Sequence, residues 1–184
     1  LKLKRRLSPR LWGGKKLEPF LKLPAHDGAE PLGEAWQVYA ENHVLNGEYA
    51  EQSLADLALS LGADLLGHLS VKRYGNKFPL LAKFIDAADK LSIQVHPDDV
   101  YARTQEAASG HLGKTEAWYI LAAEPGAKII WGFKDALSKD ELRCAIAQEQ
   151  LEPHLNVVAV KAGDVIFNPA GTVHAIGAGI FLFE

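Results

Sequence analysis

The sequence predicts a mainly β fold, a jelly-roll barrel or sandwich with two or three inserted or appended helices. Short apolar segments recur along the 184 residues and are separated by turn-forming residues, among them 16 Gly and 9 Pro. This pattern is typical of short strands and loops. Few stretches show the apolar spacing of a helix. The length suits one well-buried core, so we expect a single domain over residues 1–184.

Three segments are expected to form the helices. Residues 53–61 place leucines on one helical face, begin with a Ser-x-x-Asp box and end before a glycine. A short helix is expected over about 99–108, where Asp98 or Asp99 can cap the first turn. Residues 138–150 begin with a Ser-x-x-Glu capping box and form the third helix.

The other apolar segments are expected to form strands separated by Gly and Pro turns. After the short strands and loops of the first fifty residues, the apolar stretches are 78–87, 91–95, 116–123, 127–133, 156–167 and 180–184. Side chains alternate between the two faces of a strand, so one face of each should be buried. The residues expected in the core on this basis are Trp118, Ile120, Ile129, Trp131, Val165 and Phe167.

Composition argues against several classes of protein. The 23 acidic residues outnumber the 20 basic ones and give a net charge of −3, which disfavours a general nucleic-acid binder. A single cysteine, Cys144, excludes an internal disulfide and a cysteine-rich metal site. No stretch approaches the roughly 18 to 20 apolar residues of a membrane span. We therefore expect a cytoplasmic protein without membrane or nucleic-acid partners, whose oligomeric state the sequence leaves open.

The stretch GDVIFNPAGTVHAIGAG ends one strand and begins another across a tight turn. Gly163, Pro169, Gly171 and His174 match the pattern G-x5-P-x-G-x2-H, which is the second sequence motif of the cupin barrels. Pro169 fixes its φ and lacks an N–H donor, and Gly171 permits a positive φ. Such a turn can direct His174 into a barrel as a metal ligand. The alternative is a histidine on the solvated face of a hairpin.

A second group of possible ligands lies earlier in the chain. SIQVHPDD places Gln94 and His96 two residues apart in a strand, so both side chains point to one face. Glu116 begins another strand. Imidazoles, a carboxylate and an amide oxygen suit zinc or another divalent ion. Taken singly, His96 could instead cap a turn beside Pro97, and Glu116 could be a solvated strand end.

These segments together resemble one family. FPLLAKFIDAADKLSIQVHPDDVYA, GKTEAWYIL, GAKIIWGF and GDVIFNPAGTVHAIGAGI are similar to the type I phosphomannose isomerases, as are RLWGGKKL and GEAW near the start. The likeness extends from about Arg10 to Glu184 and is strongest to the shorter bacterial members. It implies a cupin-type jelly roll.

The resemblance also implies site residues. One zinc ion would be held by the residues that match the family's ligands, which are Gln94, His96, Glu116 and His174. Lys114, two residues before the ligand glutamate, matches a family lysine and would bind substrate or assist proton transfer. Ser92 matches a position near the sugar phosphate.

The implied activity is aldose–ketose isomerisation of mannose 6-phosphate and fructose 6-phosphate. A proton moves between C2 and C1 through a cis-enediol, whose developing charge a metal can stabilise. In the family, the last strand continues to an arginine implicated in catalysis and then to a C-terminal β domain, and this chain ends at Glu184 before both. We therefore expect a partial or truncated chain in which metal binding survives better than catalysis.

Two alternatives remain open from the residues alone. Two histidines and a carboxylate also describe the facial triad of an iron-dependent cupin oxygenase. The chain could also be a non-catalytic cupin that binds a sugar phosphate. Metal content distinguishes the first alternative from a zinc isomerase, and turnover distinguishes the second.

Overall fold

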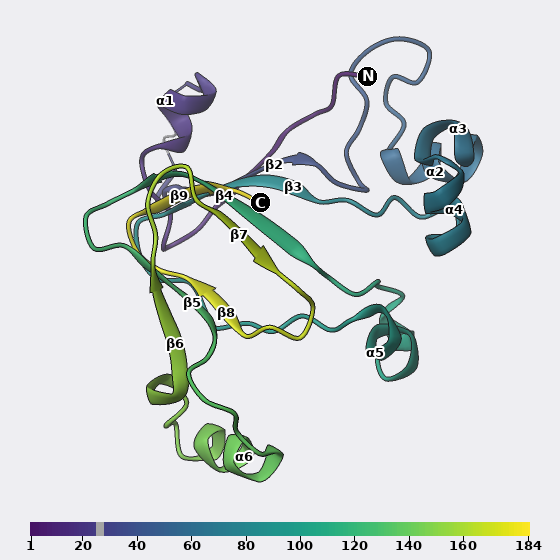
Figure 1. The fold of residues 1–184 in the computed structure, drawn as a ribbon. Coiled ribbons are helices and arrows are strands. Elements are labelled where there is room, and N and C mark those ends of the chain that lie inside the picture. Colours follow the sequence, from purple (N-terminus) through teal and green to yellow (C-terminus); the bar gives the residue numbers. More distant parts are fainter. Residues whose placement is uncertain (25–27) are drawn as a thin grey trace. The chain divides into compact units, whose positions relative to one another are not determined.

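The structure is a computed structural model that describes residues 1–24 and 28–184 (Figure 1). These residues group into two compact units. The first unit comprises residues 1–86 with 183–184, and the second comprises residues 87–182. The single catalytic domain expected over 1–184 stays a prediction.

The first unit contains an antiparallel arrangement of three strands. β1 (Arg6–Pro9) pairs with β2 (Leu32–Val38), and β2 pairs with β3 (Ala82–Ala87). β2 lies between these two partners, and its first four residues are buried. The fully buried Asp86 of β3 accepts hydrogen bonds from the backbone N–H groups of Lys16 and Leu17, at 2.5 and 3.3 Å. These bonds hold the start of the short helix α1 (Leu17–Leu21).

Three consecutive helices complete the first unit. α2 (Leu54–Leu61) confirms the helix expected over 53–61, and Ser53 caps it by accepting from the Asp56 N–H. α3 (Ala63–Leu66) and α4 (His68–Tyr74) follow directly. α1, α3 and α4 were not expected, because each has at most seven residues, too few for a clear apolar period.

The second unit is built from two antiparallel groups of strands. In the first group, β4 (Glu116–Ala123) lies between β9 (Ile180–Phe183) and β7 (Val165–Asn168). In the second group, β5 (Lys128–Phe133) lies between β6 (Leu155–Ala159) and β8 (His174–Ile176).

The helices of the second unit were predicted from their caps. α5 (Asp99–Thr104) is capped by Asp98, whose side chain accepts from the Tyr101 N–H, and a 3-10 turn follows at Ala107–Ser109. α6 (Lys139–Ala147) has the expected capping box of Ser138 and Glu141. A second 3-10 turn, Glu152–His154, leads into β6.

The segment 91–95 corrects one expectation, because it does not form a strand. Gln94 makes an isolated antiparallel bridge to His174, and the Leu91 N–H bonds the Ile176 carbonyl at 2.9 Å. These two contacts are three residues apart in 91–94 but only two residues apart in 174–176, so one extra residue interrupts the ladder.

The core expectation is half right. Trp118, Ile120 and Ile129 are buried, but the side chains of Trp131, Val165 and Phe167 are 40%, 69% and 58% exposed. The pairing between β4 and β7 explains two of these errors. Trp118 pairs with Ile166 and Glu116 with Asn168, so the even-numbered residues of β7 share the buried face. The predicted facing of β7 was wrong by one residue. Such a shift moves every side chain of a strand to the opposite face of the sheet.

The architecture confirms the predicted class, since antiparallel strands dominate and the helices are few and short. Among residues 1–24 and 28–184, no helix has the length and apolar character needed to cross a membrane.

Candidate metal centre

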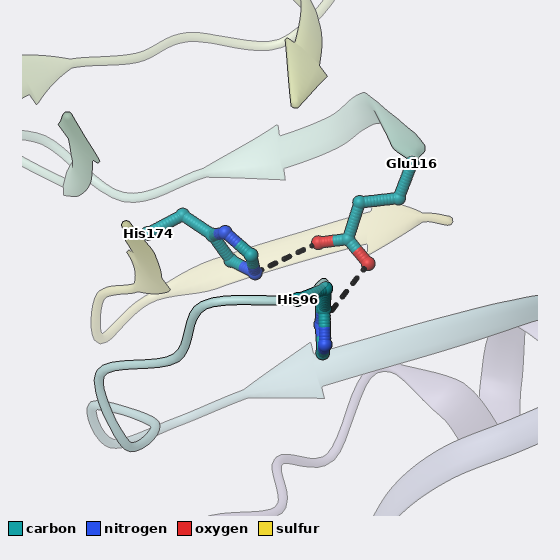
Figure 2. A group of neighbouring side chains, drawn as sticks. All are labelled: His96, Glu116 and His174. Carbon is teal, nitrogen blue, oxygen red and sulfur yellow. Dashed lines mark ion pairs between the residues drawn. The ribbon is translucent and has the colours of Figure 1, made fainter. Parts of the chain in front are cut away.

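Three of the predicted ligands converge in the second unit (Figure 2). His174 is the first residue of β8, Glu116 is the first residue of β4, and His96 lies in the loop before α5. One ligand atom from each residue lies within 4.8 Å of the other two. Glu116 and His174 are buried, and His96 is half-buried. These side chains form a group that can hold a metal ion.

The spacing of the donor atoms fits a small metal ion. His174 Nε2 lies 3.0 Å from Glu116 Oε1, and His96 Nε2 lies 3.7 Å from Glu116 Oε2. A tetrahedral ion with bonds of about 2.0–2.1 Å requires ligand atoms about 3.3 Å apart, a value between these two distances. Both histidines turn their Nε2 atoms toward the same carboxylate, so one ion can contact all three residues.

The turn before β8 determines how His174 points. Gly171 has a φ of 84°, and its N–H bonds the His96 carbonyl at 2.7 Å, which ties the turn to the loop of the second histidine. His174 Nδ1 lies 2.8 Å from the Thr172 carbonyl, which can only accept, so Nδ1 carries the proton. Nε2 is therefore the nitrogen that faces a metal, oriented by an outer hydrogen bond.

Glu116 remains ionised at neutral pH. Burial, the strongest single influence, raises the pKa of its carboxyl group. Hydrogen bonds from His174 and Lys114, together with their positive charges, lower it by more, so the pKa falls from 4.5 to about 2. The side chain is thus a negatively charged acceptor, which is the form that binds a cation.

The pairing of Glu116 with His174 raises the pKa of the histidine. Burial, again the strongest single influence, lowers the pKa of His174, but the hydrogen bonds with Glu116 and with the Thr172 carbonyl raise it above its ordinary value of 6.5. The carboxylate therefore favours a cation at Nε2, whether a proton or a metal ion. A metal that binds there must displace the proton.

Lys114 lies in the same cluster, where the sequence placed a catalytic or substrate-binding lysine. Its ammonium group contacts Glu116 Oε2 and lies 3.5 Å from His96 Nε2. Its side chain is 32% exposed, so a ligand can reach it. Its backbone N–H bonds the Pro97 carbonyl at 3.0 Å and fixes the strand entry to the His96 loop. The catalytic role of Lys114 stays a prediction.

Gln94 and Ser92 lie beside the group but are exposed. Gln94 and His174 exchange both backbone hydrogen bonds at 2.9 Å, so their side chains leave the same face of this bridge. The Gln94 amide nitrogen donates to Ser92 Oγ at 3.1 Å. Gln94 as a fourth ligand and Ser92 as a phosphate contact stay predictions.

One polar residue of this face was missed from the sequence. Asn168 ends β7, pairs with Glu116, and is only 1% exposed. Its position at the end of the apolar run Val165–Phe167, directly before Pro169, made it look like the first residue of a turn. No local signal in the sequence identifies it, because the face to which Asn168 points depends on the register of β7 with β4.

The comparisons with known proteins identify relatives of this chain. The sequence model of the family described as "Phosphomannose isomerase type I, catalytic domain" matches residues 1–124. The chain is 41% identical to the mannose-6-phosphate isomerase of Streptococcus mutans serotype c, over 99% of this chain and 55% of that protein. It is 40% identical to the mannose-6-phosphate isomerase ManA of Bacillus subtilis strain 168, over 95% of this chain and 53% of that protein.

This chain is also similar to a solved structure. The crystal structure of the mannose 6-phosphate isomerase from Bacillus subtilis superimposes with a TM-score of 0.82 at 35% identity, covering 98% of this chain and 56% of that one. The chain therefore spans about half the length of the relatives it matches.

Proposed function

Because the chain belongs to the family of type I phosphomannose isomerases, we propose that it carries the metal centre of an enzyme that interconverts mannose 6-phosphate and fructose 6-phosphate. The observation that carries the proposal is the convergence of His96, Glu116 and His174 around one point, with the Lys114 ammonium among them. A cytoplasmic location and the absence of a nucleic-acid partner stay predictions from the sequence.

The metal in this proposal is zinc. Two imidazoles and one carboxylate are protein ligands typical of catalytic zinc, whose coordination can expand to five and so also accommodate an amide ligand and a substrate oxygen. Gln94 is proposed as an additional amide ligand, because its bridge to His174 places both side chains on one face. When bound, zinc supplies positive charge beside the sugar oxygens and stabilises the negative charge that develops on them.

The side chains of this chain divide the remaining work. Glu116, ionised with a pKa of about 2, cannot act as an acid near neutral pH and serves as a ligand. Lys114 holds protons at Nζ beside Glu116 and is proposed to donate one to a sugar oxygen during the isomerisation. Ser92 is proposed to contact the phosphate group. In the direction from mannose 6-phosphate to fructose 6-phosphate, one proton moves from C2 to C1. The C1 carbonyl oxygen gains a proton and becomes a hydroxyl group, while the C2 hydroxyl group loses its proton and becomes the carbonyl, so there is no net redox change.

The alternatives from the sequence are less well supported. The relatives that match nearly the whole chain bear the name of an isomerase, which favours this activity over an iron-dependent oxygenase. It also favours an enzyme over a non-catalytic sugar-phosphate-binding protein.

The decisive test is an isomerase assay on the whole product of the gene that encodes this chain. We expect conversion of mannose 6-phosphate to fructose 6-phosphate, loss of turnover after chelation, and recovery on addition of zinc but not of iron(II) alone. Lys114→Met should lower kcat on the order of 100-fold or more, as loss of a positioned proton-transfer group typically does. Lys139→Met, at the exposed start of α6, is the matched control. Turnover that resists chelation, or none with zinc restored, would contradict the proposal.

A further inference from the structure

The side-chain amide of Asn168 lacks a hydrogen-bond partner although it is buried. The residue is 1% exposed, and both Oδ1 and Nδ2 are without a partner among the described residues. An unpaired buried amide is unfavourable, and native proteins rarely keep one without a reason. A partner that is not part of the polypeptide therefore has to be considered.

The pairing of β4 with β7 places this amide beside the metal centre. Asn168 is the direct cross-strand partner of Glu116, so the two side chains point to the same face with Cβ atoms about 5 Å apart. Trp118, two residues further along that face, packs its ring edge-on to the His174 ring at 5.5 Å. The Trp118 Nε1 atom is also buried without a partner. Unpaired polar atoms thus gather on the face that carries the ligand residues.

The usual structural role of an asparagine at this position is excluded. An asparagine before a turn can accept from the N–H groups that follow it. Here the Ala170 N–H donates to Thr115 Oγ1 at 3.2 Å, and the Gly171 N–H donates to the His96 carbonyl at 2.7 Å. The Glu116 carboxylate is already engaged with His174 and Lys114. Among the described residues, the amide of Asn168 therefore has no hydrogen-bond partner.

We propose that the side-chain amide of Asn168 hydrogen-bonds a hydroxyl group of the substrate at the metal centre. When no substrate is bound, a water molecule takes the place of this hydroxyl group. The amide offers one acceptor atom and two donor hydrogens, which match a hydroxyl group that both donates and accepts. A phosphate group fits worse, because it only accepts hydrogen bonds and would leave the Oδ1 atom of Asn168 without a donor. The inference rests on the proposed function, since it takes the substrate to be a polyhydroxylated sugar phosphate.

The test uses two variants in which Asn168 is replaced by side chains of the same shape. Val and Thr are both β-branched and suit a strand, and they differ only in that Thr has a hydroxyl group where Val has a methyl group. Zinc affinity is measured by competition with a chromophoric chelator. Affinity for sorbitol 6-phosphate, an open-chain analogue that cannot isomerise, and for inorganic phosphate, which has no sugar hydroxyl, is measured by calorimetry on the zinc-loaded protein.

We expect Asn168→Val to bind sorbitol 6-phosphate about tenfold more weakly, while inorganic phosphate and zinc change by less than about threefold. Asn168→Thr should fall between Asn168→Val and the wild type.

Two results would overturn the inference. Equal binding of sorbitol 6-phosphate by both variants and the wild type would leave a buried water as the only partner of Asn168. A tenfold loss of zinc affinity in both variants would make Asn168 a support of the metal itself.

The wild type separates this inference from the proposed function. If it neither isomerises mannose 6-phosphate nor binds sorbitol 6-phosphate, the proposed function and the inference fail together. If it does both while Asn168→Val binds the analogue unchanged, the inference alone fails.

Discussion

At the scale of single residues, His174 is a proposed ligand with a contact at each of its two ring nitrogens. Its Nε2 faces Glu116 while Nδ1 is fixed by the Thr172 carbonyl. We expect His174→Gln to weaken zinc binding by more than the roughly 10- to 100-fold that loss of an outer-shell partner costs. Competition with a chromophoric chelator measures this affinity. His154→Gln, on an exposed 3-10 turn, is the control, and equal affinities of the two variants would contradict the assignment.

Glu34 in the first unit gives a residue-scale prediction about pH. Burial, the strongest influence, raises the pKa of its carboxyl group, but Lys83 and Arg10, each 2.7 Å away, hold it below its ordinary value of 4.5. A carboxyl group with a lowered pKa in the folded state contributes stability above its unfolded pKa. That contribution is lost as the pH falls through the folded value.

The variant Glu34→Gln tests this sign. The melting temperature of the wild type should exceed that of Glu34→Gln near neutral pH, and the difference should shrink as the pH falls below about 4.5. Glu48→Gln, at an exposed position, should show no such pH dependence. A difference that stays constant down to low pH would mean that the charge of Glu34 does not stabilise the fold.

The sequence allowed the ligand residues to be predicted better than their surroundings. His96, Glu116 and His174 stand in motifs whose spacing carries the chemistry, and all three converge. Asn168 was missed because the facing of β7 depends on its register with β4. The large apolar side chains of Val165 and Phe167 suggested the opposite register.

At the scale of elements, the turn between β7 and β8 connects backbone conformation to metal binding. Gly171 has a φ of 84°, and a Cβ atom there would meet nothing within 4 Å. Gly171→Ala therefore costs stability through its backbone alone, about 1–2 kcal/mol for a left-handed residue. Because the turn orients His174, we also expect weaker zinc binding.

A second turn provides the matched control. Gly163, between β6 and β7, has a φ of 91° and equally open surroundings. Gly163→Ala should cost similar stability in thermal or urea unfolding without changing the zinc affinity. If both variants lose stability and neither loses zinc affinity, the turn does not position His174.

Local signals also decided which elements could be predicted. α2, α5 and α6 were identified by capping residues that the structure uses as caps. The segment 91–95 has a strand-like composition, yet one extra residue between its contacts with Ile176 and His174 interrupts the pairing. Strand formation requires a partner in register, and register is not a local property of the sequence.

At the scale of the whole molecule, every residue proposed for the metal centre belongs to the second unit. Ser92, Gln94, His96, Lys114, Glu116 and His174 lie within residues 87–182. The chain spans about half the length of its relatives, but the three converging ligands are contained in it. Metal binding should therefore be a property of this unit.

This placement predicts where zinc stabilises the protein. A ligand that binds only the folded state stabilises it according to its concentration relative to Kd, so zinc should raise the melting temperature and chelation should lower it. The segments that carry the ligands, 94–96, 116–118 and 172–176, should gain protection from amide hydrogen exchange when zinc is added. Segment 54–74, which spans α2 to α4 of the first unit, contains none of these ligands and should gain much less.

Hydrogen exchange followed by mass spectrometry, with and without zinc, measures both regions in one experiment. His174→Gln supplies the control, because zinc should protect neither region of a protein that has lost this ligand. Protection of segment 54–74 equal to that of the ligand segments would show that zinc acts on the whole fold. Protection that persists in His174→Gln would place the zinc away from the three converging residues, because a site that includes His174 cannot keep its affinity without the imidazole.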